Sequence, residues 1–275
     1  MNIEVMKLHP HIGAEIRGID LSRPLTEKVA DVIKQAFLDH SVILLREQNL
    51  SPEKQIEVTE IFGEADIHPL EQFHLPGHPH ILVLSNLKNK DGEPLGLEDA
   101  GPRWHTDVSF IPKPSSGTLL HALSVPPKGG DTLFAGQYAA WEMLPKEWKD
   151  RLEGLRALHG LNRITAPKWT DEQLRTVKPV PHPIIRIHPE TGRKALYAGI
   201  HVTGIESMNI SEAESIINFL YEHCSRAELV YRHTWKKGDL IVWDNRSVLH
   251  QATPFDKKYA RHMHRTTIIG DRPFG

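Results

Sequence analysis

The spacing of hydrophobic residues along this 275-residue chain predicts several helices. From Thr26 to His40, apolar residues return every three or four positions, which indicates an amphipathic helix with Thr26 as its N-cap. The apolar face of that helix consists of Val29, Ile33, Ala36 and Phe37. Further helices are predicted from Ser51-Pro52-Glu53 to Gly63, over 137–158 with a break near Pro145, and from a capping box at Ser211–Glu214 to His223.

Short runs of branched and aromatic residues between these helices predict strands. The runs cover residues 3–8, 41–46, 81–84, 118–125, 132–134 and 259–269. Two further pairs of runs flank turn sequences and predict hairpins, namely 183–187 with 194–197 and 229–235 with 240–243. Many strands with few helices favour a mainly β, α+β fold, with a double-sheet jelly-roll core and helices packed outside it.

The chain shows no repeat, low-complexity tract or linker-like run, so we expect a single domain over residues 1–275. A lid-like insertion is predicted near residues 88–103, where Gly and Pro indicate mobility. A helical insertion is predicted near residues 137–180.

Composition argues against several classes of protein. A net charge of −2 gives no electrostatic case for nucleic acid or an anionic membrane as partner. No stretch is apolar over the length of a membrane span. Cys224 is the single cysteine, so no disulfide forms within the chain, and Met1 to Val5 lack the features of a signal peptide. We therefore expect a cytoplasmic protein with no nucleic-acid or membrane partner.

His105 and Asp107 form the first candidate site, because side chains two residues apart lie on the same side of an extended strand. With His250 the set becomes two imidazoles and one carboxylate, which holds Fe(II) in non-haem oxygenases and leaves three metal positions open. The chain has 18 histidines, so a surface His-x-Asp pair and a structural histidine remain the alternatives. Other pairs with the same spacing are His9/His11, His78/His80 and His262/His264.

Arg261 and Arg265 form the second candidate site. Alternation along the strand over 259–269 places both side chains on one face, roughly 13 Å apart at about 3.3 Å per residue. At that separation they are suited to two different anions, and guanidinium is the preferred bidentate partner of a carboxylate or sulfonate. The alternative is a solvated strand face with surface ion pairs.

Together these segments resemble the taurine/α-ketoglutarate dioxygenase family, which also contains aryloxyalkanoate and alkylsulfate dioxygenases. The matching segments occur in order along nearly the whole chain. They are Ile12–Ile16, Gly18–Leu21, Trp104–Phe110, Gly129–Leu133, Trp243–Arg246 with His250, Arg261–Thr267 and Gly270–Phe274. Each segment is weak evidence by itself, but their combination is specific.

The resemblance implies a double-stranded β-helix that uses Fe(II), α-ketoglutarate and O2. By position, it implies that His105, Asp107 and His250 are the catalytic iron ligands. It assigns Thr132 and Arg261 to the distal carboxylate of α-ketoglutarate. It assigns His68 and Arg265 to the acidic group of the prime substrate.

Two positions depart from the taurine-type pattern. Glu71 stands where taurine-type members have a tyrosine, and Gly101 stands where they have an asparagine. A sulfonate is disfavoured beside the Glu71 carboxylate, so we expect a substrate other than taurine and count both positions as substrate-binding candidates. The passage from Tyr231 to Gln251 is more similar to the aryloxyacetate branch.

We therefore expect a dioxygenase that hydroxylates a small acidic substrate such as an aryloxyalkanoate, alkyl sulfate or sulfonate. The reaction is coupled to decarboxylation of α-ketoglutarate to succinate and CO2, and it cleaves the substrate where the hydroxylated carbon bears a heteroatom. We also expect a homo-oligomer, either a dimer or a tetramer. Two alternatives stay open, namely a non-catalytic metal-binding barrel that acts as a sensor or store, and a zinc or manganese hydrolase on the same barrel.

Overall fold

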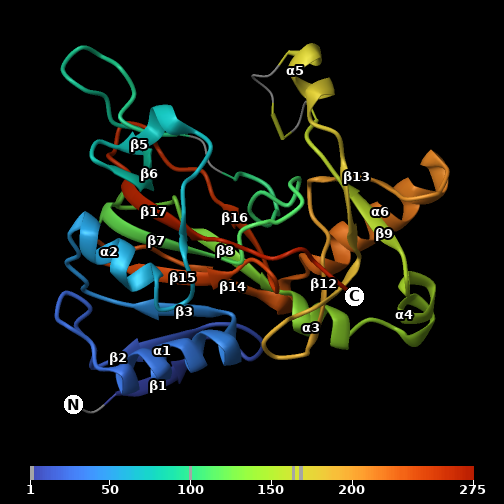
Figure 1. Cartoon of the computed structure of the whole chain (residues 1–275), viewed down its shortest axis with the longest axis horizontal. Coiled ribbons are helices and arrows are strands. Elements are labelled where there is room, and N and C mark those ends of the chain that lie inside the picture. The colour runs from blue at the N-terminus through green and yellow to red at the C-terminus, as the bar shows by residue number, and fades with distance from the viewer. Residues whose placement is uncertain (1–2, 99–100, 163–164, 167–169) are drawn as a thin grey trace.

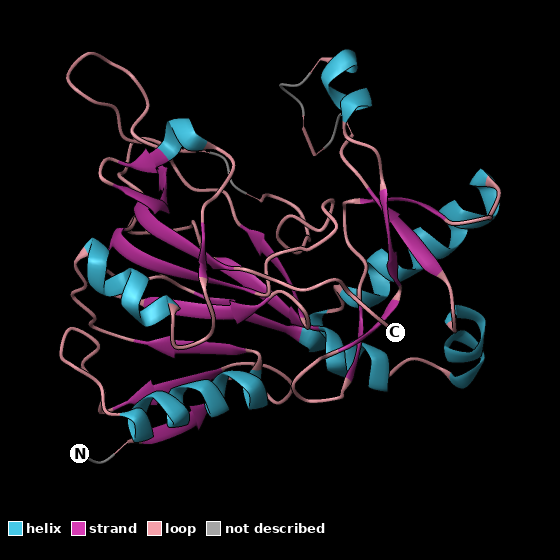
Figure 2. Cartoon of the chain, viewed as in Figure 1, coloured by secondary structure: helices cyan, strands magenta, loops and turns pink. Residues whose placement is uncertain are grey.

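The computed structural model describes residues 3–98, 101–162, 165–166 and 170–275. It shows a mixed α+β protein in which one large sheet is accompanied by three smaller ones (Figures 1 and 2). Parts of two predicted insertions, residues 99–100 of the lid-like one and 163–164 and 167–169 of the helical one, lie outside the described residues.

The large sheet has nine strands and is antiparallel except where β2 and β3 pair in parallel. Its order is β1 (Glu4–Lys7), β2 (Ala14–Arg17), β3 (Val42–Leu45), β15 (Leu240–Asp244), β7 (Gly117–Ser124), β17 (His262–Ile268), β6 (His78–Ser85) and β5 (His74–Leu75), with β4 (Ala65–Asp66) paired to β17. Strands β3 and β15 are adjacent inside the sheet and are buried on both faces, which explains the apolar runs Val42–Leu45 and Leu240–Trp243.

Helices α1 (Glu27–His40) and α2 (Pro52–Thr59) cover the outer face of the large sheet (Figure 1). Ile33, Ala36 and Phe37 of α1 form one hydrophobic cluster with sheet residues of that face. The predicted start of α2 is confirmed, because the Ser51 hydroxyl accepts a hydrogen bond from the Lys54 amide at 3.2 Å. Thr26 occupies the N-cap position of α1 but makes no side-chain cap.

A three-stranded sheet lies against the inner face of the large one. It consists of β14 (Val230–His233), β8 (Thr132–Gly136) and β16 (Val248–Ala252). Phe134 and Val248 from this sheet pack against Leu44, Leu120 and Trp243 of the large sheet in one hydrophobic cluster. The two sheets thus enclose a shared core. Two candidate site residues lie on strands that border it, His250 on β16 and Arg265 on β17.

Most of the remaining elements form a second layer on the right of Figure 1. Helices α3 (Gln137–Glu142), α4 (Lys146–Leu152) and α6 (Ile210–Cys224) share a hydrophobic cluster with two small sheets. These sheets are β10 (Val180–Pro183), β9 (Arg156–His159) and β13 (Val202–Ile205), and β11 (Ile185–Ile187) with β12 (Lys194–Leu196). Short elements η1 (Glu71–Phe73), η2 (Ala227–Leu229) and α5 (Asp171–Thr176) complete the list. None of the helices seen in the described ranges has the length and apolar character needed to cross a membrane.

The hairpin predicted around residues 236–239 is wrong. β14 pairs with β8, whereas β15 pairs with β3 and β7, so this turn carries the chain from the small sheet to the large one. The buried Asp239 carboxylate explains the difference, because it binds His233 Nε2 at 3.0 Å and Arg46 Nη1 at 3.0 Å. Arg46 follows β3, and this contact between distant segments fixes the turn.

Three smaller predictions also fail. Residues 156–158 belong to strand β9 rather than to a helix, because β10 and β13 pair with them. Helix α6 is capped by Asn209, whose side chain accepts from the Glu212 amide at 2.9 Å, and not by Ser211. Helix α2 ends at Thr59, before Gly63.

A buried ionic network fastens the turn between β15 and β16. Asp244 Oδ2 lies 2.7 Å from Arg246 Nη2 and 2.9 Å from His188 Nε2. Arg246 Nη1 also binds Glu190 at 2.8 Å, which ties the hairpin of β11 and β12 to the turn. Burial opposes ionisation of Asp244, but these partners outweigh it and hold its pKa well below the usual range.

Asp244→Asn is expected to lower the free energy of unfolding by about 3 kcal/mol, because it leaves Arg246 as a poorly compensated buried cation. Urea unfolding measures the change. Asp150→Asn is the matched control, since its exposed ion pair with Lys146 contributes little. Equal midpoints for the two variants would contradict a role for the network.

Candidate metal centre

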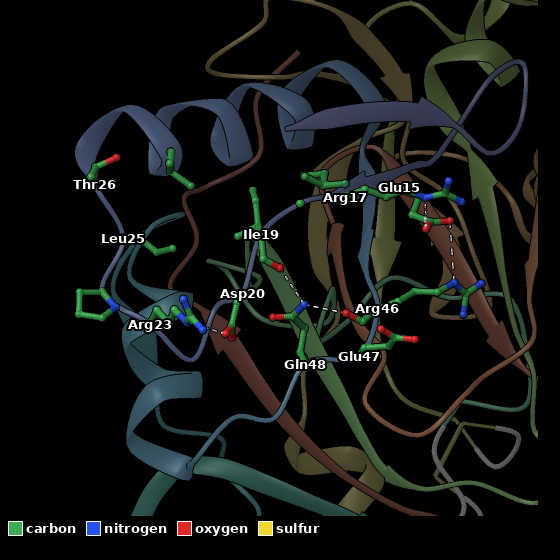
Figure 3. A pocket seen from close by; sticks show the side chains of 14 residues that line it. Glu15, Arg17, Ile19, Asp20, Arg23, Leu25, Thr26, Arg46, Glu47 and Gln48 are labelled. Carbon is green, nitrogen blue, oxygen red and sulfur yellow. Dashed lines mark hydrogen bonds and ion pairs between the residues drawn. The ribbon is translucent and has the colours of Figure 1, made fainter. Parts of the chain in front are cut away.

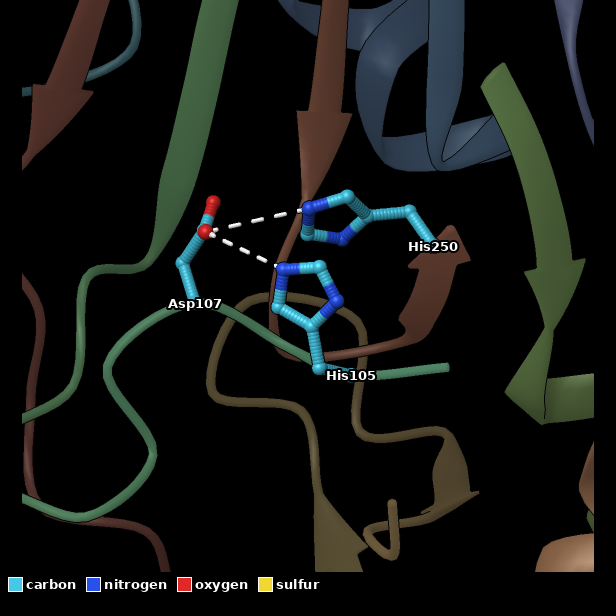
Figure 4. Close-up of side chains that lie close together, drawn as sticks. All are labelled: His105, Asp107 and His250. Atoms are coloured by element: carbon cyan, nitrogen blue, oxygen red, sulfur yellow. Dashed lines mark ion pairs between the residues drawn. The ribbon is translucent and has the colours of Figure 1, made fainter. Parts of the chain in front are cut away.

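His105, Asp107 and His250 bring three metal-binding side chains to one point, although His250 is far from the other two in sequence (Figure 4). Asp107 Oδ1 lies 3.9 Å from His105 Nε2 and 3.7 Å from His250 Nε2. The three ligand atoms lie within 4.8 Å of one another, and no other such group occurs in the part of the chain that the structure describes. The histidine pairs with the same spacing therefore do not form a comparable site there.

Backbone pairing sets this geometry. The His105 amide donates to the His250 carbonyl at 3.0 Å, and the His250 amide returns a bond to the His105 carbonyl at 2.8 Å. The predicted strand over His105 to Asp107 is wrong in detail, because only this isolated bridge forms and a turn begins at Asp107. Val108 then has a φ of 44°, which is strained for a branched residue. This conformation changes the direction of the backbone directly after Asp107.

Hydrogen bonds prepare His105 as a metal ligand. Its Nδ1 lies 2.7 Å from the Arg103 carbonyl, which can only accept, so Nδ1 carries the proton. Nε2 is then unprotonated, and its lone pair faces Asp107 and His250. Such an outer partner is typical of histidines that bind metals. The donor set, two imidazole nitrogens and one carboxylate oxygen, suits a divalent transition metal.

Electrostatics keep the three groups in the forms that a metal needs. Burial lowers the pKa of both His105 and His250, so both imidazoles are neutral. Burial would raise the pKa of Asp107, but the Arg265 guanidinium and the hydrogen bond from Thr118 reverse the effect and hold it well below the usual range. The carboxylate is therefore ionised throughout the neutral range.

A small cavity of about 40 Å³ opens beside these groups. It is lined by the three metal-site residues and by Leu84, Leu120, Thr132, Trp243, Ala252, Arg261 and Arg265. The predicted shared face of Arg261 and Arg265 is confirmed, because both border the same cavity. Thr132 borders it too, at the start of β8.

The two arginines differ in their partners. Arg265 Nη2 lies 2.9 Å from Asp107 Oδ1, an ion pair without hydrogen-bond geometry. Arg261 is only 8% exposed, and among the described residues no carboxylate lies within ion-pair distance of it. Burial lowers the pKa of Arg261 to about 10, so it still carries its charge at neutral pH. An unpaired buried cation of this kind calls for an anionic ligand.

The remaining candidates lie at different distances from the cavity. His68 is partly buried and within electrostatic reach of Arg265 and Asp107, and burial together with Arg265 lowers its pKa to about 4. Gly101 lies against His105, since a Cβ added to it would stand 2.2 Å from Cε1 of that ring. Glu71 begins the exposed η1 element and has no recorded contact with the metal-site residues.

Two features near the site were missed by sequence reasoning. His201 presents its ring edge-on to His105, with centroids 6.1 Å apart, and burial lowers its pKa to about 3. Thr118, on β7, donates a hydrogen bond to Asp107. A histidine in a loop and a threonine in a strand carry no distinctive local pattern, so only the resemblance to relatives could have identified them.

A much larger hollow, of about 780 Å³, lies elsewhere (Figure 3). It is bordered by the loop before α1 and by residues 46–48, and it shares no lining residue with the metal cavity. Its arginines are neutralised locally, since Arg17 binds Glu15 at 2.7 Å and Arg23 binds Asp20 at 3.0 Å. Arg46, which also lines the hollow, binds Asp239 at 3.0 Å, so none of its three arginines lacks a carboxylate partner as Arg261 does.

Comparisons with known proteins agree with this geometry. Residues 4–267 match the model of the family "Taurine catabolism dioxygenase TauD, TfdA family". The chain is 32% identical to an α-ketoglutarate-dependent 2,4-dichlorophenoxyacetate dioxygenase of Cupriavidus pinatubonensis, over 98% of this chain and 99% of the relative. It is 32% identical to an alkylsulfatase of Acinetobacter baylyi, over 98% of this chain and 86% of the relative.

A solved structure gives the same result in three dimensions. The crystal structure of AAD-2 in complex with Mn(II) and N-oxalylglycine superposes with a TM-score of 0.86 and 33% identity. The match covers 99% of this chain and 98% of that one.

His105→Ala is expected to lower Mn(II) affinity by more than about 100-fold. Loss of a residue that only hydrogen-bonds a metal ligand typically costs about 10–100-fold in affinity, and loss of the ligand itself should cost more. The electron paramagnetic resonance signal of free Mn(II) measures binding. His11→Ala, which alters an exposed histidine of a pair with the same spacing, is the control and should bind like the wild type. Retention of Mn(II) binding by the His105 variant would show that the cluster is not the metal site.

Gly101→Ala is expected to weaken Mn(II) binding about tenfold, because the added methyl group collides with the His105 ring and displaces a ligand. Gly92→Ala is the matched control. It has a similarly positive φ of 83°, against 66° at Gly101, but open space around its Cβ. If both variants lose Mn(II) affinity to the same extent, the strain of a positive φ rather than the collision with His105 explains the loss.

Proposed function

This chain belongs to the taurine catabolism dioxygenase TauD, TfdA family, and from that premise we propose how its residues bind two acids at one metal. The protein is an oxidoreductase, an α-ketoglutarate-dependent dioxygenase with Fe(II) at His105, Asp107 and His250. We infer that its prime substrate is a small organic acid of the aryloxyalkanoate, sulfate ester or sulfonate type. The named activities of the dichlorophenoxyacetate dioxygenase and the alkylsulfatase support this range.

One observation carries the proposal, namely that two buried guanidinium groups share a cavity with the metal cluster. A reaction between two acids at one metal needs two anion sites, one for each acid. Arg261 lacks a carboxylate partner among the residues described, and Arg265 has only Asp107. Neutral ligands would leave the Arg261 charge buried and uncompensated.

Arg261 and Thr132 are proposed to bind the distal carboxylate of α-ketoglutarate. Trp235 Nε1 lies 2.9 Å from Thr132 Oγ1, and an indole nitrogen can only donate. The Thr132 hydroxyl therefore accepts from Trp235 and keeps its own proton for another acceptor. Together with the guanidinium of Arg261, it provides a directed pair of donors for one carboxylate.

Arg265 and His68 are proposed to bind the acidic group of the prime substrate. His68 is neutral above pH 5, because its pKa is about 4. It then contributes a single hydrogen bond rather than a charge, while Arg265 supplies the charge. Gly101 leaves room beside His105 where a side chain would collide, and Glu71 is proposed to disfavour a sulfonate that approaches from the exposed side.

The chain's own residues mainly orient the reactants and exclude water. Fe(II) supplies the activation of O2 that oxidises α-ketoglutarate to succinate and CO2 and hydroxylates the substrate. The neutral imidazoles and the ionised Asp107 keep the ligand set ready for the metal. Apolar side chains such as Leu84 and Leu120 line the cavity and limit access of water.

We further propose that the two facing sheets form the double-stranded β-helix of the family, in a single catalytic domain. A cytoplasmic location and a homo-oligomeric state, dimer or tetramer, also remain proposals. The segment over 88–103 is proposed as a lid over the substrate. Its described part is tied to β6, since the Leu97 amide donates to the Val83 carbonyl at 2.9 Å. The family match removes the non-catalytic barrel and the hydrolase as alternatives.

Purified protein with Fe(II), ascorbate and α-ketoglutarate is expected to release succinate faster when a true substrate is added. A panel of aryloxyalkanoates, alkyl sulfates, sulfonates and other small carboxylic acids identifies the class, with aryloxyacetates expected above taurine. Succinate is measured by chromatography, and the His105→Ala protein is the blank. Faster release with taurine than with any aryloxyacetate would contradict the assignment around Glu71.

Replacing Arg261 and Arg265 one at a time tests whether they bind different acids. Arg261→Met should raise KM for α-ketoglutarate by roughly 30-fold or more, since loss of a buried charged partner costs about 2 kcal/mol or more. Arg265→Met should raise KM for the prime substrate by a similar factor and leave the KM for α-ketoglutarate within about threefold. The same pattern for both variants would refute separate anion sites.

A further inference from the structure

The two oxygens of the Asp107 carboxylate have different surroundings. Oδ1 faces the site, with His250 Nε2 at 3.7 Å, His105 Nε2 at 3.9 Å and Arg265 Nη2 at 2.9 Å. Oδ2 faces away and accepts a hydrogen bond from Thr118 Oγ1 at 2.6 Å. One oxygen is therefore directed to the metal site, and the other is engaged by the protein.

The direction of this hydrogen bond follows from a chain of donors. The Trp243 indole, which can only donate, lies 3.1 Å from Asn245 Oδ1 and so fixes the orientation of that amide. Asn245 Nδ2 then donates to Thr118 Oγ1 at 2.9 Å. Because Thr118 accepts this bond, its single proton is free for Asp107 Oδ2.

The chain of donors is rigid. Thr118, Trp243 and Asn245 are all buried, and they come from β7, from β15 and from the turn after β15. Thr106 Oγ1 also donates to the Asn245 carbonyl at 2.7 Å, which ties the segment between His105 and Asp107 to the same turn. Chains of hydrogen bonds in a dry interior strengthen one another.

We propose that Thr118, oriented by Asn245 and Trp243, is a positioning residue that confines Asp107 to one metal-facing oxygen. A carboxylate is able to offer one or both oxygens to a cation. A second oxygen would occupy one of the three positions that this ligand set leaves open for other reactants. By holding Oδ2, Thr118 keeps that position for α-ketoglutarate, so the inference rests on the proposed function.

Thr118→Val tests this, because valine keeps the shape of threonine and lacks the hydroxyl. The Mn(II)-loaded variant is expected to bind N-oxalylglycine at least about tenfold more weakly than the wild type, because the released carboxylate oxygen then competes for an open metal position. Its Mn(II) affinity should change by less than about threefold, because the released oxygen becomes a second metal ligand and offsets the loss of the outer partner. Isothermal titration measures both affinities.

Two controls isolate the hydroxyl. Thr118→Ser restores the donor and should bind N-oxalylglycine within about threefold of the wild type. Thr59→Val removes another fully buried threonine hydroxyl, which bonds Thr266 rather than the site, and should leave N-oxalylglycine binding unchanged.

The outcomes separate this inference from the proposed function. If wild-type protein with Mn(II) fails to bind N-oxalylglycine, the proposed function itself is overturned. If the wild type binds and Thr118→Val binds equally well, only the role of Thr118 is overturned. A parallel loss of Mn(II) and N-oxalylglycine affinity would also overturn it, since that pattern indicates general disorder of the site.

Trp243→Phe keeps the proposal testable if Thr118→Val does not fold. The change removes the indole donor that orients Asn245 and retains an aromatic ring. We expect a weaker effect in the same direction, about threefold to fivefold on N-oxalylglycine affinity with Mn(II) affinity retained, because the hydroxyl of Thr118 remains but is less well oriented. Unchanged N-oxalylglycine binding in a folded Trp243 variant would overturn the proposal.

Discussion

A buried carboxylate, Asp107, is the group on which the arrangement of the site depends. It is 4% exposed, and an ionised group at that depth requires compensation. The Arg265 guanidinium and the Thr118 hydroxyl compensate it from two other strands, while His105 and His250 present neutral imidazoles that would hold a metal ion together with the carboxylate. Each of these segments is therefore held in a position that suits a divalent metal as well as the carboxylate.

The need for compensation explains why the site lies between the two sheets rather than in the large surface hollow. Within the sandwich, β16 supplies His250, β17 supplies Arg265 and β7 supplies Thr118. His250 and Arg265 line a small buried cavity, where electrostatic interactions are strong, and Thr118 binds the Asp107 carboxylate beside it. In the open hollow near α1, Arg17, Arg23 and Arg46 each have a carboxylate partner, so the hollow presents no unpaired buried cation of the kind that Arg261 provides.

The uncompensated charge of Arg261 has a functional meaning in this context. A buried cation without a partner lowers stability, and proteins retain such groups where a ligand supplies the missing charge. The mixed α+β scaffold tolerates the cost because its cores on either side of the large sheet are extensive and apolar. The second layer adds hairpin residues that tie the turn before β16 through Asp244 and Arg246.

The sequence by itself determined the elements and the chemistry of the candidates. Local patterns predicted α1, β3, β7 and β17 because apolar spacing and burial act over a few residues. Ligand chemistry made His105, Asp107 and His250 candidates, and the resemblance of the ordered motifs to one family selected them as the metal ligands.

Tertiary structure alone decided how these parts meet. The turn over 236–239 looked like a hairpin, yet Asp239 binds Arg46 and the strands on either side join different sheets. Residues 105–107 looked like a strand, yet a single bridge to His250 and the strained Val108 set their course. Thr118 gave no local signal, because its role depends on a hydrogen bond from Asn245, more than 100 residues away in the sequence. Such contacts between distant segments form only after folding, so no local pattern encodes them.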